Sequence, residues 1–407
     1  MSFAPTARLP VAALLLLHAL PAAAGPVELD LAAALERAHR AAPDAVAARG
    51  QLAVAEAAVT GASVAFIDNP EVDGGAGPRL TSARPIDIDV RIEQNLEPWR
   101  RGPRRAVARA GVAQAKADVD VALRRLDLDV ATAFFAALHA DRAAELARRA
   151  EELAQKAVET AERRRKAGDI TDLDLDLART ALGRARSATH ANASERASAI
   201  GALAALIGAA PDEVLAVRGD LKPLALPDLA ALRAAIASRP DVRALDAERS
   251  AATAEHDLAV ANGRIELALW AGYRREDADS IVAGGLRFTL PAWNRAQGDK
   301  AAAAAKERRA IATREAVVRV AARQLADALA AYDSAKTAVD VFERDVLPGL
   351  NDSEQLLEKT LAAGQITVSD FLVARQEILN GRREYLDRLL ALATASAAVR
   401  FVAGGAL

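Results

Sequence analysis

The chain has 407 residues, of which 52% are hydrophobic but only 3% aromatic, a composition that favours long, closely packed helices. Its 53 Lys and Arg residues nearly balance its 55 Asp and Glu residues, and the two signs are interspersed, so nucleic acid is not an expected partner. The absence of cysteine excludes disulfides and thiol chemistry.

Residues 1–24 are predicted to be a secretory signal peptide. Arg8 precedes a mostly apolar stretch over residues 11–20, and three alanines at 22–24 offer a small-residue cleavage site. No later run of 18 or more apolar residues occurs, so no helical membrane span is expected.

A first repeat is predicted over residues 25–210. It begins with an amphipathic helix over 35–65, and two strands follow near 70–80 and 86–94, the second alternating apolar and charged residues. A stretch from Pro103 to Ala167 then lacks further proline and predicts a helix of roughly 98 Å. Apolar residues recur in it at every seventh position, as in a left-handed coiled coil: Val112, Val119, Leu126, Ala133, Ala140, Ala147, Ala154 and Ala161.

A short phrase ends this helix and returns 196 positions later. It reads Ala-Gly-Asp-Ile-Thr at residues 167–171 and Ala-Gly-Gln-Ile-Thr at residues 363–367. Gly168 and Gly364 suit the left-handed position after a helix, and Thr171 and Thr367 suit the N-cap of a returning helix with an acid three residues later. Each phrase therefore predicts the tip of a helical hairpin, over 103–207 and 299–400. A repeat of this length indicates an internally duplicated chain.

A proline-bearing connector, residues 211–227, separates the first repeat from a second one over residues 228–403. The second repeat has the same order of elements: a helix over 232–260, strands near 264–273 and 281–290, and the hairpin 299–400. Its heptad positions are Val318, Leu325, Tyr332, Val339 and Val346. The strands of both halves have the weak signature of membrane β-hairpins.

Four strands per chain are too few to close a membrane barrel, which needs about eight. Because open sheet edges are not tolerated in lipid, several chains would have to share one barrel. The helices, on the order of 100 Å long, would then project away from the membrane. A barrel continued by a helical tube would form a conduit.

The duplicated organisation, the two hairpin tips, the Arg239-Pro240-Asp241 helix start and Val346-Leu347-Pro348 together resemble the TolC family of outer membrane factors. The resemblance implies a mainly α, internally duplicated protein that trimerises into a twelve-stranded β-barrel in the outer membrane, continued by a twelve-helix α-barrel in the periplasm. It also implies the outer-membrane channel of a tripartite efflux system, a passive exit duct served by a periplasmic adaptor protein and an inner-membrane pump. The connector is similar to that of the cation-efflux, CzcC-like branch, which makes heavy-metal cations the expected cargo.

The resemblance also implies site residues at the hairpin tips. Asp174 and Asp370 are candidates for a periplasmic gate, and each is equally well explained as an acid that caps a helix. The first tip is expected to be acidic, with Asp169, Asp172, Asp174 and Asp176. The candidate adaptor-docking residues, which would otherwise be plain hairpin connectors, are Gly168, Asp169, Ile170, Thr171, Gly364, Gln365, Ile366 and Thr367. Trp99, Trp270, Trp293 and Tyr273 are expected to be membrane-interface anchors or to pack at the barrel rim, and not to form ligand sites.

Other functions remain open at this point. A drug-efflux or type I secretion outer membrane channel would share the duct architecture. A periplasmic adaptor would show one helical hairpin rather than two, and a secreted coiled-coil protein would lack aromatic-edged strands. The sequence has no catalytic constellation or phosphate loop, and no His lies at metal-ligand spacing from another His or Cys, so neither enzyme activity, cofactor nor metal site is expected.

Overall fold

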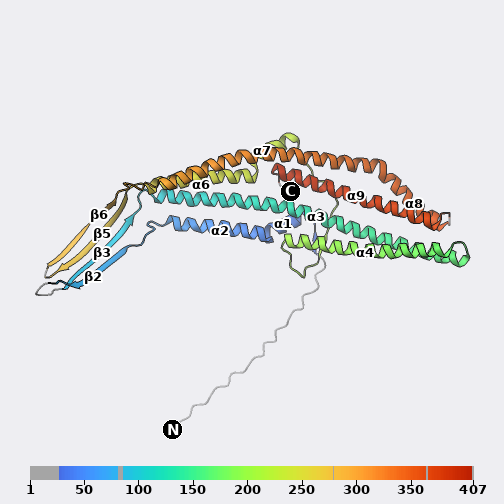
Figure 1. The fold of residues 1–407 in the computed structure, drawn as a ribbon, viewed down its shortest axis with the longest axis horizontal. Helices are drawn as coiled ribbons and strands as arrows, with labels where there is room; N and C mark the ends of the chain where they lie inside the picture. The colour runs from blue at the N-terminus through green and yellow to red at the C-terminus, as the bar shows by residue number, and fades with distance from the viewer. Residues whose placement is uncertain (1–26, 81–85, 278, 364, 406–407) are drawn as a thin grey trace, which may run out of the picture.

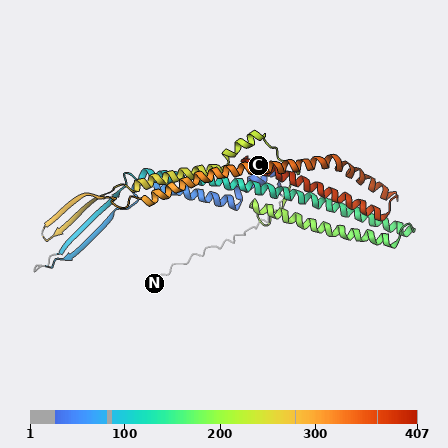
Figure 2. The same cartoon turned by 45° about the horizontal axis from the view of Figure 1, so that its top comes forward.

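The computed structural model describes residues 27–80, 86–277, 279–363 and 365–405. It is an elongated molecule with a β-sheet at one end and long helices along the rest (Figure 1). A second orientation shows the sheet extending from one end of the helical body at an angle to the helices (Figure 2). The predicted signal peptide, residues 1–24, lies outside the described residues.

Four strands form one antiparallel sheet in the order β2-β3-β5-β6. The first repeat contributes β2 (Glu71–Pro78) and β3 (Ile86–Leu96), and the second contributes β5 (Glu266–Glu276) and β6 (Asp279–Thr289). The two hairpins join through β3 and β5, whose pairing runs from Ile88 opposite Arg275 to Leu96 opposite Leu267. The strands lie within a few residues of the predicted ranges.

The first repeat begins with two helices, α1 (Leu31–Ala41) and α2 (Pro43–Ser63), where the sequence predicts one. The break falls at Ala42, which is extended with ψ of 137° because a proline follows it. Beyond β3, α3 (Arg101–Ala167) runs unbroken for 67 residues and α4 (Asp172–Leu206) returns along it. Six of the eight predicted heptad residues of α3 are buried, namely Val119, Leu126, Ala140, Ala147, Ala154 and Ala161.

The predicted connector contains a short strand. In it, β4 (Leu215–Val217) pairs in parallel with β1 (Val27–Leu29), which ties the connector to the start of the first repeat. Next to it lies the largest hydrophobic cluster, at mid-length of α3, where Val130, Phe134 and Leu138 pack with Leu203 and Ile207 of the α4 end. The centre of the molecule, where both repeats and the connector meet, is therefore its best-packed region.

The second repeat contains α5 (Leu229–Ala235), α6 (Pro240–Asn262), α7 (Gln297–Val341), α8 (Leu347–Ala362) and α9 (Val368–Ala403). Its long helix differs from the prediction, because a π-helical segment, Phe342–Val346, separates α7 from α8. Pro348 follows at the second position of α8, and proline cannot donate the backbone bond that a continuous helix requires. The heptad shifts at this segment, so Val346 is exposed while Phe342 is buried and stacks on Tyr385.

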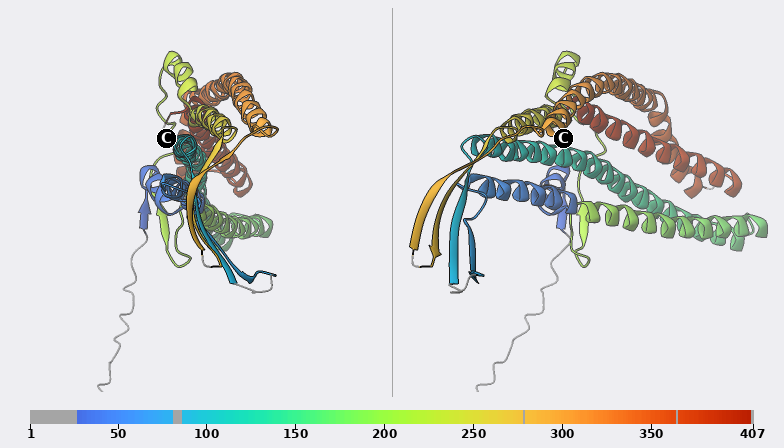
Figure 3. Two further views of the ribbon diagram at one scale, coloured as in Figure 1. Left: turned by 90° about the vertical axis from the view of Figure 1, so that its left-hand side faces the viewer. Right: turned by 60° about the vertical axis from the view of Figure 1, so that its left-hand side comes forward.

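The helices of the two repeats pack in the order α4, α3, α9, α7. Within each repeat, the long helix packs on its own return helix, and α3 also packs on α9 of the other repeat. Figure 3 shows the two hairpins side by side along the body, with the sheet strands leaving from the opposite end. The strands and the hairpin tips are thus held at opposite ends of a rigid helical body.

Candidate functional site

The four-stranded sheet has one apolar and one charged face. Antiparallel register places Ile92 beside Ala271 and Val90 beside Tyr273 on the first face, and Asp89 beside Arg274 on the second. Large side chains of the apolar face are exposed to solvent in the single chain: Val72, Ile86, Val90, Ile92, Leu269, Tyr273, Val282, Leu286 and Phe288. Because such a patch is unusual on a soluble surface, this face requires an apolar environment or a partner.

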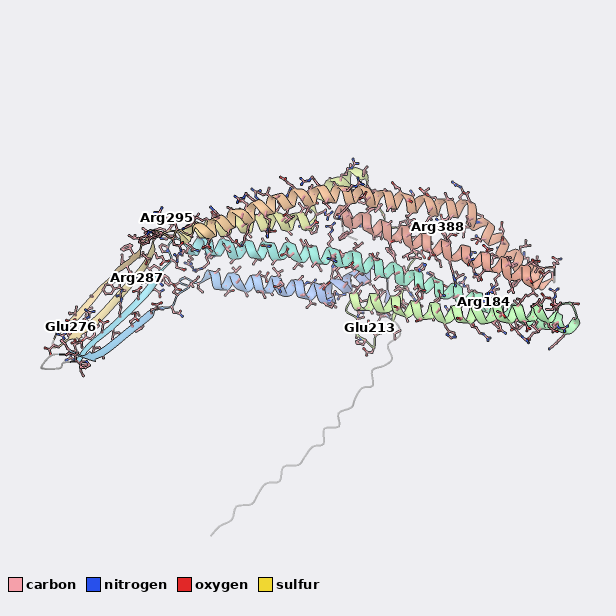
Figure 4. All side chains as sticks on the ribbon, in the orientation of Figure 1. Arg184, Glu213, Glu276, Arg287, Arg295 and Arg388 are labelled. Carbon is pink, nitrogen blue, oxygen red and sulfur yellow. The ribbon has the colours of Figure 1, made fainter. Side chains whose placement is uncertain are left out.

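Ion pairs connect strands on the charged face. The Arg274 Nε donates to Asp89 Oδ2 over 2.9 Å, and Arg287 pairs with Glu93. Figure 4 marks Arg287 on the sheet and Glu276 toward its far end. Neither arginine is among the site residues predicted from the sequence, although Arg287 lies within a predicted strand and Arg274 directly follows one.

Trp270 also belongs to the charged face of the sheet. Its ring lies under the guanidinium of Arg91, 4.5 Å from the ring centroid, and directly over Gly285. A Cβ at Gly285 would come within 3.2 Å of the indole Nε1, so glycine makes room for the ring. The register explains this placement, because Trp270 is opposite Glu93 and not opposite an apolar residue.

The other predicted aromatic anchors occupy different places. Trp99 and Trp293 lie in the links between sheet and helices, where the Trp99 indole donates to the Ile265 carbonyl over 3.0 Å. Arg295 marks the same junction in Figure 4. Tyr273 lies on the apolar face, and its hydroxyl is 3.1 Å from that of Ser280.

The first hairpin tip has the geometry that its sequence predicts. Gly168 is left-handed with φ of 82°, and the Asp169 N–H donates to the Arg164 carbonyl over 2.9 Å. Thr171 caps α4 through a full capping box, since its hydroxyl accepts the Asp174 N–H over 3.2 Å and its own N–H donates to Asp174 Oδ2 over 3.0 Å. Ile170 is partly buried against the hairpin core.

The second tip is similar in its described residues, with Gly364 lying outside them. The Gln365 N–H donates to the Thr360 carbonyl over 3.0 Å. The Thr367 hydroxyl accepts the Asp370 N–H over 3.1 Å and donates to Asp370 Oδ2 over 2.7 Å. Asp174 thus takes part in a full capping box, whereas, within the described residues, the Asp370 carboxylate accepts only the hydroxyl of the capping Thr367.

A contact joins the two tips directly. The Arg164 guanidinium donates to the Ile366 carbonyl over 3.3 Å, and Val368 is buried in the same apolar cluster that Ile170 contacts. The predicted docking residues of both repeats therefore form one continuous end of the molecule, at which Gly168, Asp169, Thr171, Gln365 and Thr367 are exposed.

The expected acidity of the first tip is offset by cations. The last turn of α3 carries Arg164, Arg165 and Lys166, and Arg165 holds Asp172 through two bonds of 2.5 and 2.8 Å. These bonds lower the pKa of Asp172, and the bonds from the Thr171 hydroxyl and backbone lower the pKa of Asp174. Both carboxylates consequently stay ionised down to acidic pH.

The described parts of the chain contain no helix that is both long and apolar enough to cross a membrane. Among the same residues, no group of three or more His, Cys, Asp or Glu side chains is placed to hold a metal ion.

One protein-family model matches part of the chain. Residues 231–405 match the family model described as "Outer membrane efflux protein". A comparison with curated proteins gives no significant match.

Solved structures resemble nearly the whole chain. The chain superposes on CusC, whose structures concern transmembrane channel formation, with a TM-score of 0.74, 18% identity and 92% of both chains covered. The open MtrE outer membrane channel of Neisseria gonorrhoeae gives a TM-score of 0.74 at 20% identity, over 93% of this chain and 89% of that one. The outer membrane protein VceC of Vibrio cholerae gives 0.70 at 19% identity, over 92% and 96%. The chain therefore has the fold of these outer membrane proteins, and its second half matches the outer membrane efflux protein family.

Proposed function

We propose that this protein is the outer-membrane channel of a tripartite efflux system, a passive duct without enzymatic activity. Its sheet would lie in the outer membrane and its helices would project into the periplasm. The observation that carries the proposal is the two-faced sheet, whose exposed apolar side suits lipid and whose charged side suits a water-filled interior.

The sheet edges support assembly into a shared barrel. Within the described residues, β2 and β6 each pair with a neighbour on one side only. Unpaired backbone groups are costly in lipid, so these edges require strands from other copies. Three copies would supply twelve strands and close the barrel.

The duplicated helices support the same assembly. Since α3 packs on α9, the internal repeat implies an equivalent contact between α7 and α4, and the described chain makes no comparable contact between those two helices. A neighbouring copy would supply it. A row of small, exposed residues on α7 suits such close packing: Ala322, Ala326, Ala330 and Ser334. Twelve helices from three copies would then form the periplasmic tube.

The tips are proposed to dock a periplasmic adaptor that links the duct to an inner-membrane pump. Two observations support this role. The tips lie at the end opposite the sheet, and residues from both repeats are exposed there. Asp174 and Asp370 are proposed gate residues, because three copies would place six such carboxylates around one aperture. Capping and gating are compatible, since a capping carboxylate keeps its charge.

Heavy-metal cations are the proposed cargo, with the CzcC-like branch as the proposed subfamily. The support is electrostatic, because eight carboxylates and three arginines share the charged sheet face within the strands. An interior with this excess would favour cations. The carboxylates are Glu71, Asp73, Asp87, Asp89, Glu93, Glu266, Glu276 and Asp279, and the arginines are Arg91, Arg274 and Arg287.

Membrane fractionation combined with a heat-dissociation assay tests the proposed assembly. We expect an outer-membrane trimer that Ala326→Arg with Ala330→Arg abolishes and that Ala47→Arg, on the exposed side of α2, leaves intact. A soluble monomer would refute the proposal.

Two further experiments address gate and cargo. Asp174→Ala with Asp370→Ala is expected to raise single-channel conductance, and an unchanged conductance would leave both acids as caps alone. Deletion of the gene is expected to raise sensitivity to divalent heavy metals. Sensitivity to hydrophobic drugs instead would favour a drug-efflux channel.

A further inference from the structure

A groove runs between α4 and α9 in the half of the helical body nearer the tips. Its volume is about 460 Å³, and its floor is formed by Ala147 and Ala150 of α3. The α4 wall runs from Leu177 to Ala188 and the α9 wall from Leu372 to Arg383. Each wall therefore spans about three helical turns, or roughly 17 Å. The groove is long enough to accommodate three turns of another helix.

Three arginines line this groove without carboxylate partners. Arg184 lies on the α4 wall, whereas Arg375 and Arg383 lie on the α9 wall, and none of the lining residues is Asp or Glu. Among the described residues, none of the three forms a salt bridge. Figure 4 shows Arg184 on α4. Nearby on the same helical hairpins, by contrast, Arg179 pairs with Glu162, Arg186 with Glu151 and Arg382 with Glu354.

Arg375 is the most constrained of the three. It is only 7% exposed, one Nη donates to the Ala150 carbonyl, and its Nε has no hydrogen-bond partner among the described residues. Burial lowers the pKa of its guanidinium. A buried charge without a counter-ion is costly, and an anion in the groove would relieve that cost.

The internal repeat shows that the fold itself does not require this arrangement. Arg179 is the counterpart of Arg375 in the first repeat, 196 positions earlier, and it is exposed and bonded to Glu162 over 3.0 Å. Arg383 corresponds in the same way to Ser187. The first hairpin lacks this feature at the equivalent positions. The unpaired arginines are therefore specific to the groove between α4 and α9.

The groove rim is apolar and open. Leu177 is 39% exposed and Val373 is 66% exposed, on opposite walls. We propose that the groove binds an amphipathic helix of a partner protein, with a small apolar stripe against the α3 floor and Asp or Glu side chains paired to Arg184, Arg375 and Arg383. Resting on the proposed function, this inference specifies the chemistry of the adaptor: an acidic helix. Charge-assisted bonds formed away from bulk water would give the contact its specificity.

The test uses the full-length protein in detergent and a labelled, stapled helical peptide of about 14 residues as the probe. The peptide carries Glu at i and i+4 beside Ala and Leu, and a matched peptide carries Gln instead. We expect the Glu peptide to bind at low salt at least about tenfold more tightly than the Gln peptide. Arg184→Glu with Arg383→Glu should remove that preference and create one for a Lys peptide.

Arg148→Glu is the matched control, because Arg148 is exposed on α3 at the same level of the body but outside the groove. It should leave Glu-peptide binding unchanged. Equal binding of Glu and Gln peptides would overturn the proposal, as would displacement of the peptide by millimolar inorganic phosphate, which would indicate a small-anion site.

Loss of the trimer in the Arg184→Glu, Arg383→Glu variant would also overturn the proposal, by assigning the groove to a second copy of the chain. Retained trimers without peptide selectivity would refute the acidic helix while leaving the proposed duct intact. The two proposals therefore fail through different measurements.

Discussion

The Arg-Pro-Asp segment at the start of α6 gives the sharpest prediction about stability. Arg239 is buried and holds Asp241 through two bonds of 2.9 and 2.7 Å, while its third nitrogen donates to the Val402 carbonyl over 3.0 Å. Arg124 of α3 approaches Asp241 to 3.5 Å, and its guanidinium lies 4.6 Å from the Phe401 ring centroid. The Asp241 carboxylate thus links Arg124 of α3 to Arg239. Arg239 in turn connects the start of α6 to the end of α9.

Asp241→Asn should destabilise this junction strongly, because two buried arginines lose the anion that they share. Removing one member of a fully buried pair costs about 3–5 kcal/mol. Since the Asp241 side chain is 31% exposed, solvent screening reduces the expected loss to about 2–3 kcal/mol. Burial and the nearby charge of Arg239 already lower the pKa of Arg124 to about 10, which shows how much the site depends on Asp241.

The pH dependence follows from the direction of the pKa shift. Burial raises the pKa of Asp241, but the bonds and charges of Arg239 and Arg124 outweigh it and lower the pKa below its ordinary value. The carboxylate therefore stabilises the fold above the unfolded-state pKa of about 3.9, and this stabilisation is lost as pH falls through the lower folded value. The difference between wild type and Asp241→Asn should be full at pH 7 and should decrease steadily as pH falls below about 4.

Thermal unfolding by circular dichroism and hydrogen exchange at the α9 end measure this effect. Asp44→Asn is the matched control, because Asp44 also follows a helix-starting proline but has an alanine where Arg239 stands. It should cost only about 0.3–1 kcal/mol through the helix dipole. Equal losses in the two variants, or an Asp241→Asn loss that does not decrease as pH falls below about 4, would refute the reasoning.

Two further predictions concern helix ends and helix packing. Asp174→Ala should cost about 1 kcal/mol and speed hydrogen exchange in the first turn of α4 more than Asp370→Ala does in α9, because only the Asp174 carboxylate also accepts the backbone N–H of its N-cap threonine; equal changes would contradict this. Gly381→Val should cost about 1–3 kcal/mol more than Gly183→Val in thermal unfolding, since a Cβ at Gly381 would lie 2.7 Å from Leu350 Cδ1 while none lies within 4 Å at Gly183; equal costs would contradict close packing of α8 on α9.

Local chemistry made the hairpin tips predictable. Gly168 needs a left-handed conformation, and Thr171 with Asp174 forms a cap whose partners lie three residues apart, so neighbouring residues determine the geometry. The strand alternation of residues 86–93 is similarly local. Patterns among residues a few positions apart were sufficient to predict the repeated tip sequence, the strands and the two helical hairpins.

Long-range features were not predictable in the same way. The burial of Phe342 involves stacking on Tyr385, which lies 43 positions later, and the face of Trp270 depends on strand register. The role of Arg239 depends on α3 and on the end of α9, neither of which its local sequence identifies. The arginine groove likewise exists only because α4 and α9 meet over α3.

The central claim is that the sheet spans the outer membrane with one face in lipid and the other in a water-filled interior. Because the chain has no cysteine, single cysteines placed one after another along β3 and β5 can test it without background. Membrane-soluble and water-soluble thiol reagents should label alternate positions, with lipid access at Val90 and Tyr273 and water access at Arg91 and Arg274. Uniform labelling by the water-soluble reagent at all four positions would contradict the account.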